Sequence, residues 1–361
     1  MSFIISFGVS TFLCLIIVAT QRIHGSTTLD SDMVGTRRFH KVPAPRIGGI
    51  CVLIGIAAGG AYHGLQADNV LFLFKWAGIA AIPVFLGGFL EDLSKSVTPR
   101  DRLLLAFLSA AIAYYELGVG LDRLGWLWFD DHILTYPGIS LALTLFMAAG
   151  VAHAANIIDG FHGLLIGFSI IALSAFCYIA YIENLDTLVI YISIVIGALL
   201  GIFLWNFPTG KIFLGDGGAY LIGFVLAIVA LLLVKRSANV SPWFPLAVLI
   251  YPVFETIFSI YRKGLLRGLP VTDPDGIHMH MLIYGRVIRH FGSSKVLSRN
   301  PKTSLLMWLL STISILPAVI WWNNTPMLAL CVILWSLAYI VLYFKIVRFK
   351  LVRTTNATHV C

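Results

Sequence analysis

Residues 138–182 read GISLALTLFMAAGVAHAANIIDGFHGLLIGFSIIALSAFCYIAYI, and this stretch decides the fold class. Its two apolar runs, 138–155 and 163–182, are each long enough to cross the roughly 30 Å hydrocarbon core of a bilayer as a helix. Between them, NIIDGFHG brings an Asn, an Asp and a His into an otherwise hydrophobic sequence. Because the cost of a carboxylate depends on where the lipid lies, the membrane topology has to be settled before this polar segment is interpreted.

The rest of the chain has the same apolar character. Hydrophobic residues make up 59% of its 361 residues, charged residues only 12%, and the mean hydropathy is +0.91, which excludes an ordinary soluble globular protein. The sequence therefore predicts an all-α polytopic membrane protein of about 10–11 transmembrane helices. The other apolar runs lie at 3–20, 47–63, 73–90, 103–119, 187–205, 217–234, 243–262, 303–322 and 326–345. The first run has no basic segment before it, so we expect a retained helix and not a signal peptide.

The distribution of Lys and Arg predicts the orientation of these helices. If the N-terminus lies outside and the helices alternate, only Lys75, Arg123, Lys235 and Arg236 of the 25 Lys and Arg residues fall on the outer side. The positive-inside rule strongly favours this orientation over its inverse. The formal net charge of +8 is explained by this topology, so no nucleic acid is expected as a partner.

The domain organisation follows from the same assignment. Once the helices are placed, no soluble domain of useful size and no internal repeat remains. We expect residues 1–361 to form a single integral-membrane domain, with a basic tail at 345–361 on the inner side.

The polar clusters of the chain gather on this inner side. Unrelated clusters would rarely all fall on one given face, so they predict a single site there. The clusters are RRFHKVPAPRIGG (37–49), GGFLEDLSKSVTPRDRLL (87–104), NIIDGFHGLLIG (156–167), FPTGKIFLGDGGAYLIG (207–223) and DPDGIHMHMLIYGR (273–286).

The acidic residues of these clusters have several interpretations. Glu91 and Asp92 end the third predicted helix, and Lys95 lies on the same face if the helix continues. Such a group can bind a divalent metal, take a proton or form a solvated helix end. By itself, Asp159 is expected to be an N-cap at the start of the next helix. Asp216 lies among glycines at another helix start, where backbone N–H groups bind anions and an Asp would bring a metal to the same phosphate.

The last cluster adds histidines. His278 and His280 lie two residues apart in a polar loop that also holds Arg286, without a third ligand at zinc spacing. Donors of this kind suit a nucleotide or a diphosphate. Together with three separated acidic positions, they indicate a site for Mg²⁺ and phosphates, because this hard cation prefers carboxylate and phosphate oxygens.

At these residues the sequence resembles the polyprenyl-phosphate N-acetylhexosamine-1-phosphate transferases of glycosyltransferase family 4. This membrane family includes undecaprenyl-phosphate N-acetylglucosamine-1-phosphate transferase and phospho-N-acetylmuramoyl-pentapeptide transferase. The resemblance covers nearly the whole chain and is carried by four ordered motifs. They are an acidic pair followed by a basic residue (Glu91, Asp92, Lys95), N-x-x-D-G-x-[DN]-G-L (Asn156, Asp159, Gly160, Gly163, Leu164), G-D-x-G (Gly215, Asp216, Gly218) and a histidine-rich inner loop (His278, His280).

The resemblance implies a magnesium-dependent transferase. It implies transfer of a sugar 1-phosphate from a UDP-sugar to polyprenyl (undecaprenyl) phosphate, which gives a polyprenyl-diphosphate sugar and UMP and initiates cell-envelope polysaccharide synthesis. By the same analogy the protein lies in the bacterial inner (plasma) membrane, with its active-site loops and C-terminus in the cytoplasm. Mn²⁺ is an alternative metal, and a homodimer is left open.

The resemblance also implies roles for individual residues. The catalytic residues would be Asp92, Asp159 and Asp216, with Asp216 and Asp92 as metal ligands. Direct attack by the lipid phosphate is favoured over a covalent Asp intermediate, because the acceptor already supplies an anionic oxygen, but the sequence leaves both open. The substrate-binding residues would be Glu91, Lys95, Asn156, Gly160, His162, His278, His280 and Arg286.

Three positions depart from the family pattern. Glu91 stands where Asp is usual, His162 where a second Asp or Asn is usual, and Met281 where many relatives have another His. The thinner histidine loop favours a simple N-acetylhexosamine donor over a muramoyl-peptide donor, so the pentapeptide transferase reaction is the alternative.

An ion-coupled transporter or lipid flippase is the competing class. Such a protein is expected to carry ionisable residues near the bilayer midplane and broken helices along a pathway. Here the predicted helix interiors are nearly free of charge, and Glu255 lies toward an inner end. A membrane scaffold without catalysis would leave the carboxylates and glycine loops unexplained.

Overall fold

The computed structural model describes residues 1–29, 43–65, 67–268, 270, 276–289 and 299–348. These residues form helices and connecting segments, and no strand occurs among them. Residues 37–42 and 273–275 of the polar clusters, and 349–361 of the predicted tail, lie outside the described ranges. The helices are α1 (Ser2–Ala19), α2 (Gln21–Thr28), α3 (Gly48–Gly64), α4 (Asp68–Ser94), α5 (Pro99–Leu117), α6 (Leu127–His132), α7 (Pro137–Ile158), α8 (Leu164–Ile182), α9 (Asp186–Asn206), α10 (Gly215–Arg236), α11 (Trp243–Val248), α12 (Ile250–Ile260), η1 (Tyr261–Leu266), α13 (Met279–Leu282), η2 (Ile283–Ile288), α15 (Arg299–Ile320) and α16 (Thr325–Arg348).

The length of the helices confirms the predicted all-α polytopic membrane fold. Among the described residues, 8 helices are long and apolar enough to cross a membrane, namely α1, α4, α7, α8, α9, α10, α15 and α16. The remaining predicted runs are helical too. Of these, α3 is apolar with 17 residues, and α5 begins with the charged residues Arg100, Asp101 and Arg102.

The sequence predicted one continuous helix at 243–262, and this prediction was wrong. The run breaks at Leu249, between α11 and α12. The physical reason lies at Pro252, which has no N–H to donate to the carbonyl of Val248 and whose ring crowds that carbonyl. After the break, α12 continues directly into η1.

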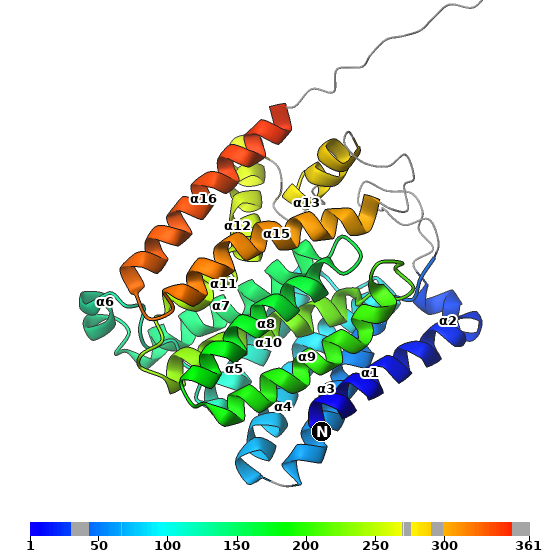
Figure 1. Cartoon of the computed structure of the whole chain (residues 1–361), viewed down its shortest axis with the longest axis horizontal. Coiled ribbons are helices and arrows are strands. Elements are labelled where there is room, and N and C mark those ends of the chain that lie inside the picture. The colour runs from blue at the N-terminus through cyan, green and yellow to red at the C-terminus, as the bar shows by residue number, and fades with distance from the viewer. Residues whose placement is uncertain (30–42, 66, 269, 271–275, 290–298, 349–361) are drawn as a thin grey trace, which may run out of the picture.

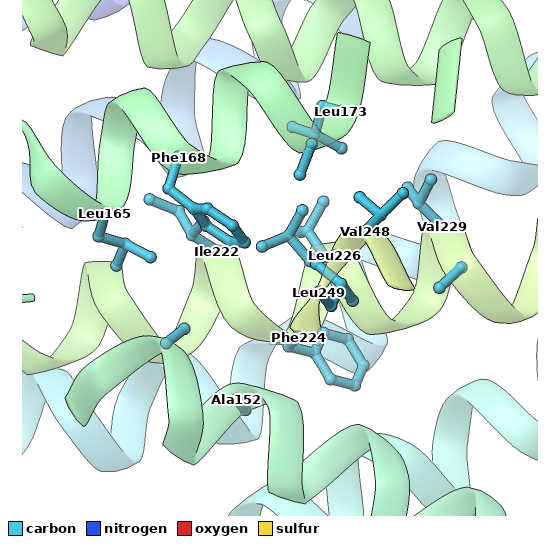
Figure 2. Packing of buried hydrophobic residues seen from close by; sticks show 14 of the residues in the cluster. Ala152, Leu165, Phe168, Leu173, Ile222, Phe224, Leu226, Val229, Val248 and Leu249 are labelled. Carbon is cyan, nitrogen blue, oxygen red and sulfur yellow. The ribbon is translucent and has the colours of Figure 1, made fainter. Parts of the chain in front are cut away.

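Helix α10 forms the core of the bundle. Every residue from 217 to 234 is buried, as expected for a helix that is apolar on all sides. Figure 1 shows α10 in the middle of the bundle, where it packs against α3, α4, α7 and α8. Figure 2 shows Leu165 and Phe168 of α8 beside Ile222 of α10. The start of α10 is therefore held from several sides, and Asp216 sits in that first turn.

Glycines let α3 and α4 approach the start of α10 closely. A Cβ atom on Gly88 of α4 would lie 2.5 Å from the carbonyl carbon of Asp216, and one on Gly49 of α3 would lie 2.5 Å from the Cα of Gly218. Any side chain at either position would collide with backbone, and small residues are typical of such helix contacts in membranes. This contact brings the acidic end of α4 beside Asp216.

Candidate active site

All five polar clusters of the sequence contribute to one cavity of about 450 Å³. It lies where the ends of α4, α7 and α9 and the start of α10 meet α13 and the start of α15. Of the predicted site residues, Glu91, Asn156, Asp159, Gly160, His162, Asp216 and His278 line it. Two arginines that the sequence did not single out, Arg46 and Arg102, line it as well.

Asp216 lies between these two arginines. The Nη2 atom of Arg46 is 3.3 Å from Oδ1 of Asp216, and Nη1 of Arg102 donates to Oδ2. The two guanidinium groups balance the charge of Asp216. Its side chain is 18% exposed and therefore remains accessible from the cavity. Both arginines belong to the quoted clusters. Three acidic residues in one site require nearby positive charge, and this requirement could have identified the two arginines from the sequence.

Asp92 caps the start of α10. Its Oδ1 accepts the backbone N–H of Asp216 and its Oδ2 that of Gly217, both at 2.9 Å. The side chain is only 1% exposed, so Asp92 does not form a solvated helix end. The expectation that these backbone N–H groups would bind a phosphate is also corrected, because both donate to Asp92. A carboxylate at this position is favoured by the helix dipole.

Arg46 is placed by backbone pairing between two distant segments. The N–H of Phe213 donates to the carbonyl of Pro45 at 2.8 Å, and that of Gly48 donates to the carbonyl of Phe213 at 2.9 Å. Gly215 follows with φ +72°, and a Cβ there would overlap the Arg46 carbonyl and the Asp92 carboxylate. The glycine is therefore required by both its backbone angle and the close approach.

Asp159 is not the N-cap that the sequence suggested. It follows the last residue of α7, whereas α8 begins only at Leu164. Its carboxyl faces the cavity, and within the described ranges no residue donates a hydrogen bond to it. Burial, together with the nearby Asp216 carboxylate, raises the pKa of Asp159 to about 7, although Arg46 opposes the rise. This acid is therefore poised to exchange its proton for a cation.

The segment around Asp159 is fixed from two sides. The N–H of His162 donates to Oδ1 of Asn300 at 2.7 Å, and the Ser304 hydroxyl donates to the His162 carbonyl at 2.7 Å. The Nδ1 atom of His162 lies 3.0 Å from the carbonyl oxygen of Pro208. His162 thus anchors the cavity wall through its backbone and its ring, while Asn156 and Gly160 contribute to the same wall.

The two histidines have different surroundings. His278 lines the cavity, and its Nδ1 is 2.9 Å from Oε1 of Glu255. His280 is fully buried behind the wall, with Nδ1 3.3 Å from the Tyr251 hydroxyl and Nε2 close to Gly160. Sequence reasoning noted Glu255 but gave it no role. A carboxylate in an apolar helix was the signal available for it.

Besides Asp92 and His280, two predicted residues do not line the cavity. Helix α4 ends at Ser94, and Lys95 is an exposed residue with φ 54°, so the helical continuation that would align it with Asp92 does not occur. Arg286 donates to the carbonyls of Ile346, at 2.8 Å, and Val347, so it caps the end of α16. Glu91 lines the cavity, and its Oε2 also accepts the N–H of Val97 at 2.9 Å.

The oxygen donors of the cavity suit a magnesium ion shared with a substrate. Within the described part of the chain, no group of three or more His, Cys, Asp or Glu residues could hold a metal alone. Asp159 and Asp216 nevertheless line one cavity with Glu91 and Asn156. Mg²⁺ usually takes one or two carboxylates and completes its shell with water and phosphate oxygens, so this set fits.

The fold and the site together define a polytopic helical membrane protein with a polar cavity of carboxylates and arginines at its helix ends, which is a class suited to phosphoryl chemistry. The family model of glycosyl transferase family 4 matches residues 74–234, a range that includes the acidic pair, Asp159 and Asp216. The chain is similar to this family over that range, in agreement with the resemblance seen in the sequence.

Individual relatives extend the match over most of the chain. A probable undecaprenyl-phosphate N-acetylglucosaminyl 1-phosphate transferase of Bacillus subtilis (strain 168) is 28% identical over 343 residues, which cover 91% of this chain and 88% of the relative. A phospho-N-acetylmuramoyl-pentapeptide-transferase of Bacillus cytotoxicus is 32% identical over 213 residues, 54% of this chain and 62% of the relative. One from Streptococcus pneumoniae (strain Hungary19A-6) is 27% identical over 307 residues, 78% of this chain and 88% of the relative.

Proposed function

We propose that this membrane enzyme transfers a sugar 1-phosphate, first of all N-acetylhexosamine 1-phosphate, from a UDP-sugar to undecaprenyl phosphate. The products are undecaprenyl-diphosphate sugar and UMP, in an initiating step of cell-envelope polysaccharide synthesis. The observation that carries the proposal is the cavity in which Asp216, at the start of the buried helix α10, lies between Arg46 and Arg102 and shares the cavity with the carboxyl of Asp159. The relatives that span most of the chain support the same reaction class.

The chemistry needs positioning and charge neutralisation. An oxygen of the lipid phosphate attacks the phosphorus that bears the sugar, and the bond from that phosphorus to the UMP oxygen breaks. No protein nucleophile is required, because the acceptor already carries an anionic oxygen. Arg46 and Arg102 are close enough to Asp216 to exchange part of this pairing for phosphate oxygens, which guanidinium groups bind in bidentate fashion.

Asp159 and Asp216 are the residues that would hold Mg²⁺, with Mn²⁺ as a substitute. When bound, the ion supplies charge neutralisation for the donor diphosphate and the acceptor phosphate. Asp92 was expected from the sequence to be a second ligand and a catalytic group. Because both of its oxygens accept N–H groups of α10, we propose that it acts by fixing Asp216.

The orientation in the membrane is part of the proposal. We place the cavity on the cytoplasmic side of the inner membrane and the N-terminus outside, in a single membrane domain. The distribution of charge supports this orientation, because only Lys75, Arg123, Lys235 and Arg236 of the 25 Lys and Arg residues fall on the predicted outer side. A homodimer stays a prediction.

The reaction is tested by UMP release from the purified protein in detergent. The assay contains undecaprenyl phosphate, Mg²⁺ or EDTA, and one of UDP-N-acetylglucosamine, UDP-N-acetylgalactosamine or UDP-N-acetylmuramoyl-pentapeptide. We expect lipid- and metal-dependent UMP release with a simple N-acetylhexosamine donor, and loss of turnover in Asp216→Asn. Release only with the pentapeptide donor would assign the alternative reaction. Absence of release with every donor from a folded protein would contradict the proposal.

A further inference from the structure

Glu255 is a buried carboxylate in a largely apolar helix. It lies in α12 with 0% exposure, next to the buried side chains of Tyr251 and Phe258. A carboxylate in such surroundings is costly unless charged or polar partners compensate it, so its partners show what it is for.

Three donors from outside α12 meet this carboxylate. The Nδ1 atom of His278 lies 2.9 Å from Oε1, and the backbone N–H of Met279 donates to Oε2 at 3.2 Å. The hydroxyl of Tyr339, in α16, also donates to Oε2. Glu255 therefore ties the first residues of α13 to α12 and α16.

This contact sets the orientation of the His278 ring. Because a carboxylate only accepts hydrogen bonds, the proton in this contact lies on Nδ1 of His278, and that edge of the ring is held by Glu255. His278 lines the same cavity as Asp159 and Asp216. His280 provides a contrast, because its Nδ1 meets the Tyr251 hydroxyl and its side chain is buried behind the cavity wall.

We infer that Glu255 is a positioning residue for the transfer reaction. It holds the His278 ring at the cavity wall with Nδ1–H donating to the carboxylate, and the opposite edge meets the diphosphate of the donor, to which Nε2–H donates when the ring is in its imidazolium form. The backbone N–H of Met279 and the contact with Nδ1 of His278 hold the carboxylate at this wall, and the Tyr339 hydroxyl adds one hydrogen bond on the side of α16. This inference rests on the proposed function, since the diphosphate is the group that His278 would meet. Removing a hydrogen-bond partner that orients a functional histidine typically lowers activity by about 10–100-fold.

The test is a double-mutant cycle on UMP release, with Glu255→Gln, His278→Ala and the double variant. Gln keeps the size of the side chain and removes its charge. We expect each single variant to lower kcat/KM for the UDP-sugar about 10–100-fold, with the KM for undecaprenyl phosphate unchanged. The double variant should be no slower than His278→Ala, because Glu255 acts through His278.

Tyr339→Phe is the matched control. It removes one hydrogen bond from the same carboxylate without touching His278, and we expect at most about a threefold loss of kcat/KM. Normal kcat/KM in Glu255→Gln, or losses that add fully in the double variant, would overturn the inference while the wild type still releases UMP. A wild type without UMP release would instead overturn the proposed function, and this inference with it.

Discussion

Replacing Asp92 with Asn should weaken the start of α10 and disturb Asp216. The wild-type carboxylate accepts the N–H groups of Asp216 and Gly217, both at 2.9 Å, and its side chain is 1% exposed. An Asn offers one oxygen and turns an NH₂ group toward the second N–H. A buried N–H without a partner costs about 1–3 kcal/mol, and the lost charge at a helix N-terminus adds about 0.3–2 kcal/mol.

The expected loss in free energy of unfolding is therefore about 1–5 kcal/mol, together with at least a tenfold loss of kcat because Asp216 shifts. Chemical unfolding in detergent measures the first quantity and UMP release the second. Asp122→Asn is the matched control, since Asp122 pairs with Lys235 near the other end of α10 and is 43% exposed. An exposed ion pair contributes only about 0–1 kcal/mol, so this variant should be nearly as stable and active as the wild type.

The two interpretations of Asp92 give different results. If Asp92 is a helix cap, the Asp92→Asn protein loses stability and turnover together. If Asp92 instead acts directly on the lipid phosphate, the variant loses turnover alone. If Asp92→Asn unfolds within about 0.5 kcal/mol of the wild type but is inactive, the capping argument is refuted.

Three further predictions concern Asp159, a glycine pair and Arg286. Burial, together with Asp216, raises the pKa of Asp159 to about 7, so its carboxyl is protonated below that pH. Mn²⁺ should therefore bind about tenfold more weakly at pH 6 than at pH 8, as measured by electron paramagnetic resonance. Asp159→Asn should lose this pH dependence, and an equal dependence in the variant would contradict the assignment. Gly88→Ala should lower both stability and activity, because its Cβ would lie 2.5 Å from the Asp216 backbone. Gly78→Ala lies in the same helix with no atom within 4 Å of its Cβ, so in unfolding experiments it should be neutral or stabilising by up to about 1 kcal/mol. Equal effects at both glycines would argue against the close contact. Arg286→Ala should lower the midpoint of thermal unfolding, because α16 loses its cap, and leave the KM for the UDP-sugar within about twofold of the wild type; a large rise in KM would restore the substrate-binding role.

Much of the site was predictable from the sequence because its residues lie in short motifs at the predicted helix ends. Asn156, Asp159 and Asp216 line the cavity, as expected of residues that join on one face. The detailed roles were less accessible. Asp159 was expected as a helix cap and lacks a cap contact, while Asp92 was expected to face substrate and instead caps α10. The sequence could not show this, because a helix cap is defined by the backbone N–H groups that its side chain accepts. For Asp92, in α4, these N–H groups belong to α10.

By itself, the sequence determined the membrane fold and the helix ends at which polar residues gather, because apolar length and charge distribution are properties of consecutive residues. Only the tertiary structure decided which side chains meet. Arg102 contacts Asp216 across 114 residues, and Glu255 meets Tyr339 across 84. Such pairs depend on how α5, α10, α12 and α16 pack, and packing of membrane helices is set by small residues and close backbone contacts that leave little periodic signal in the chain.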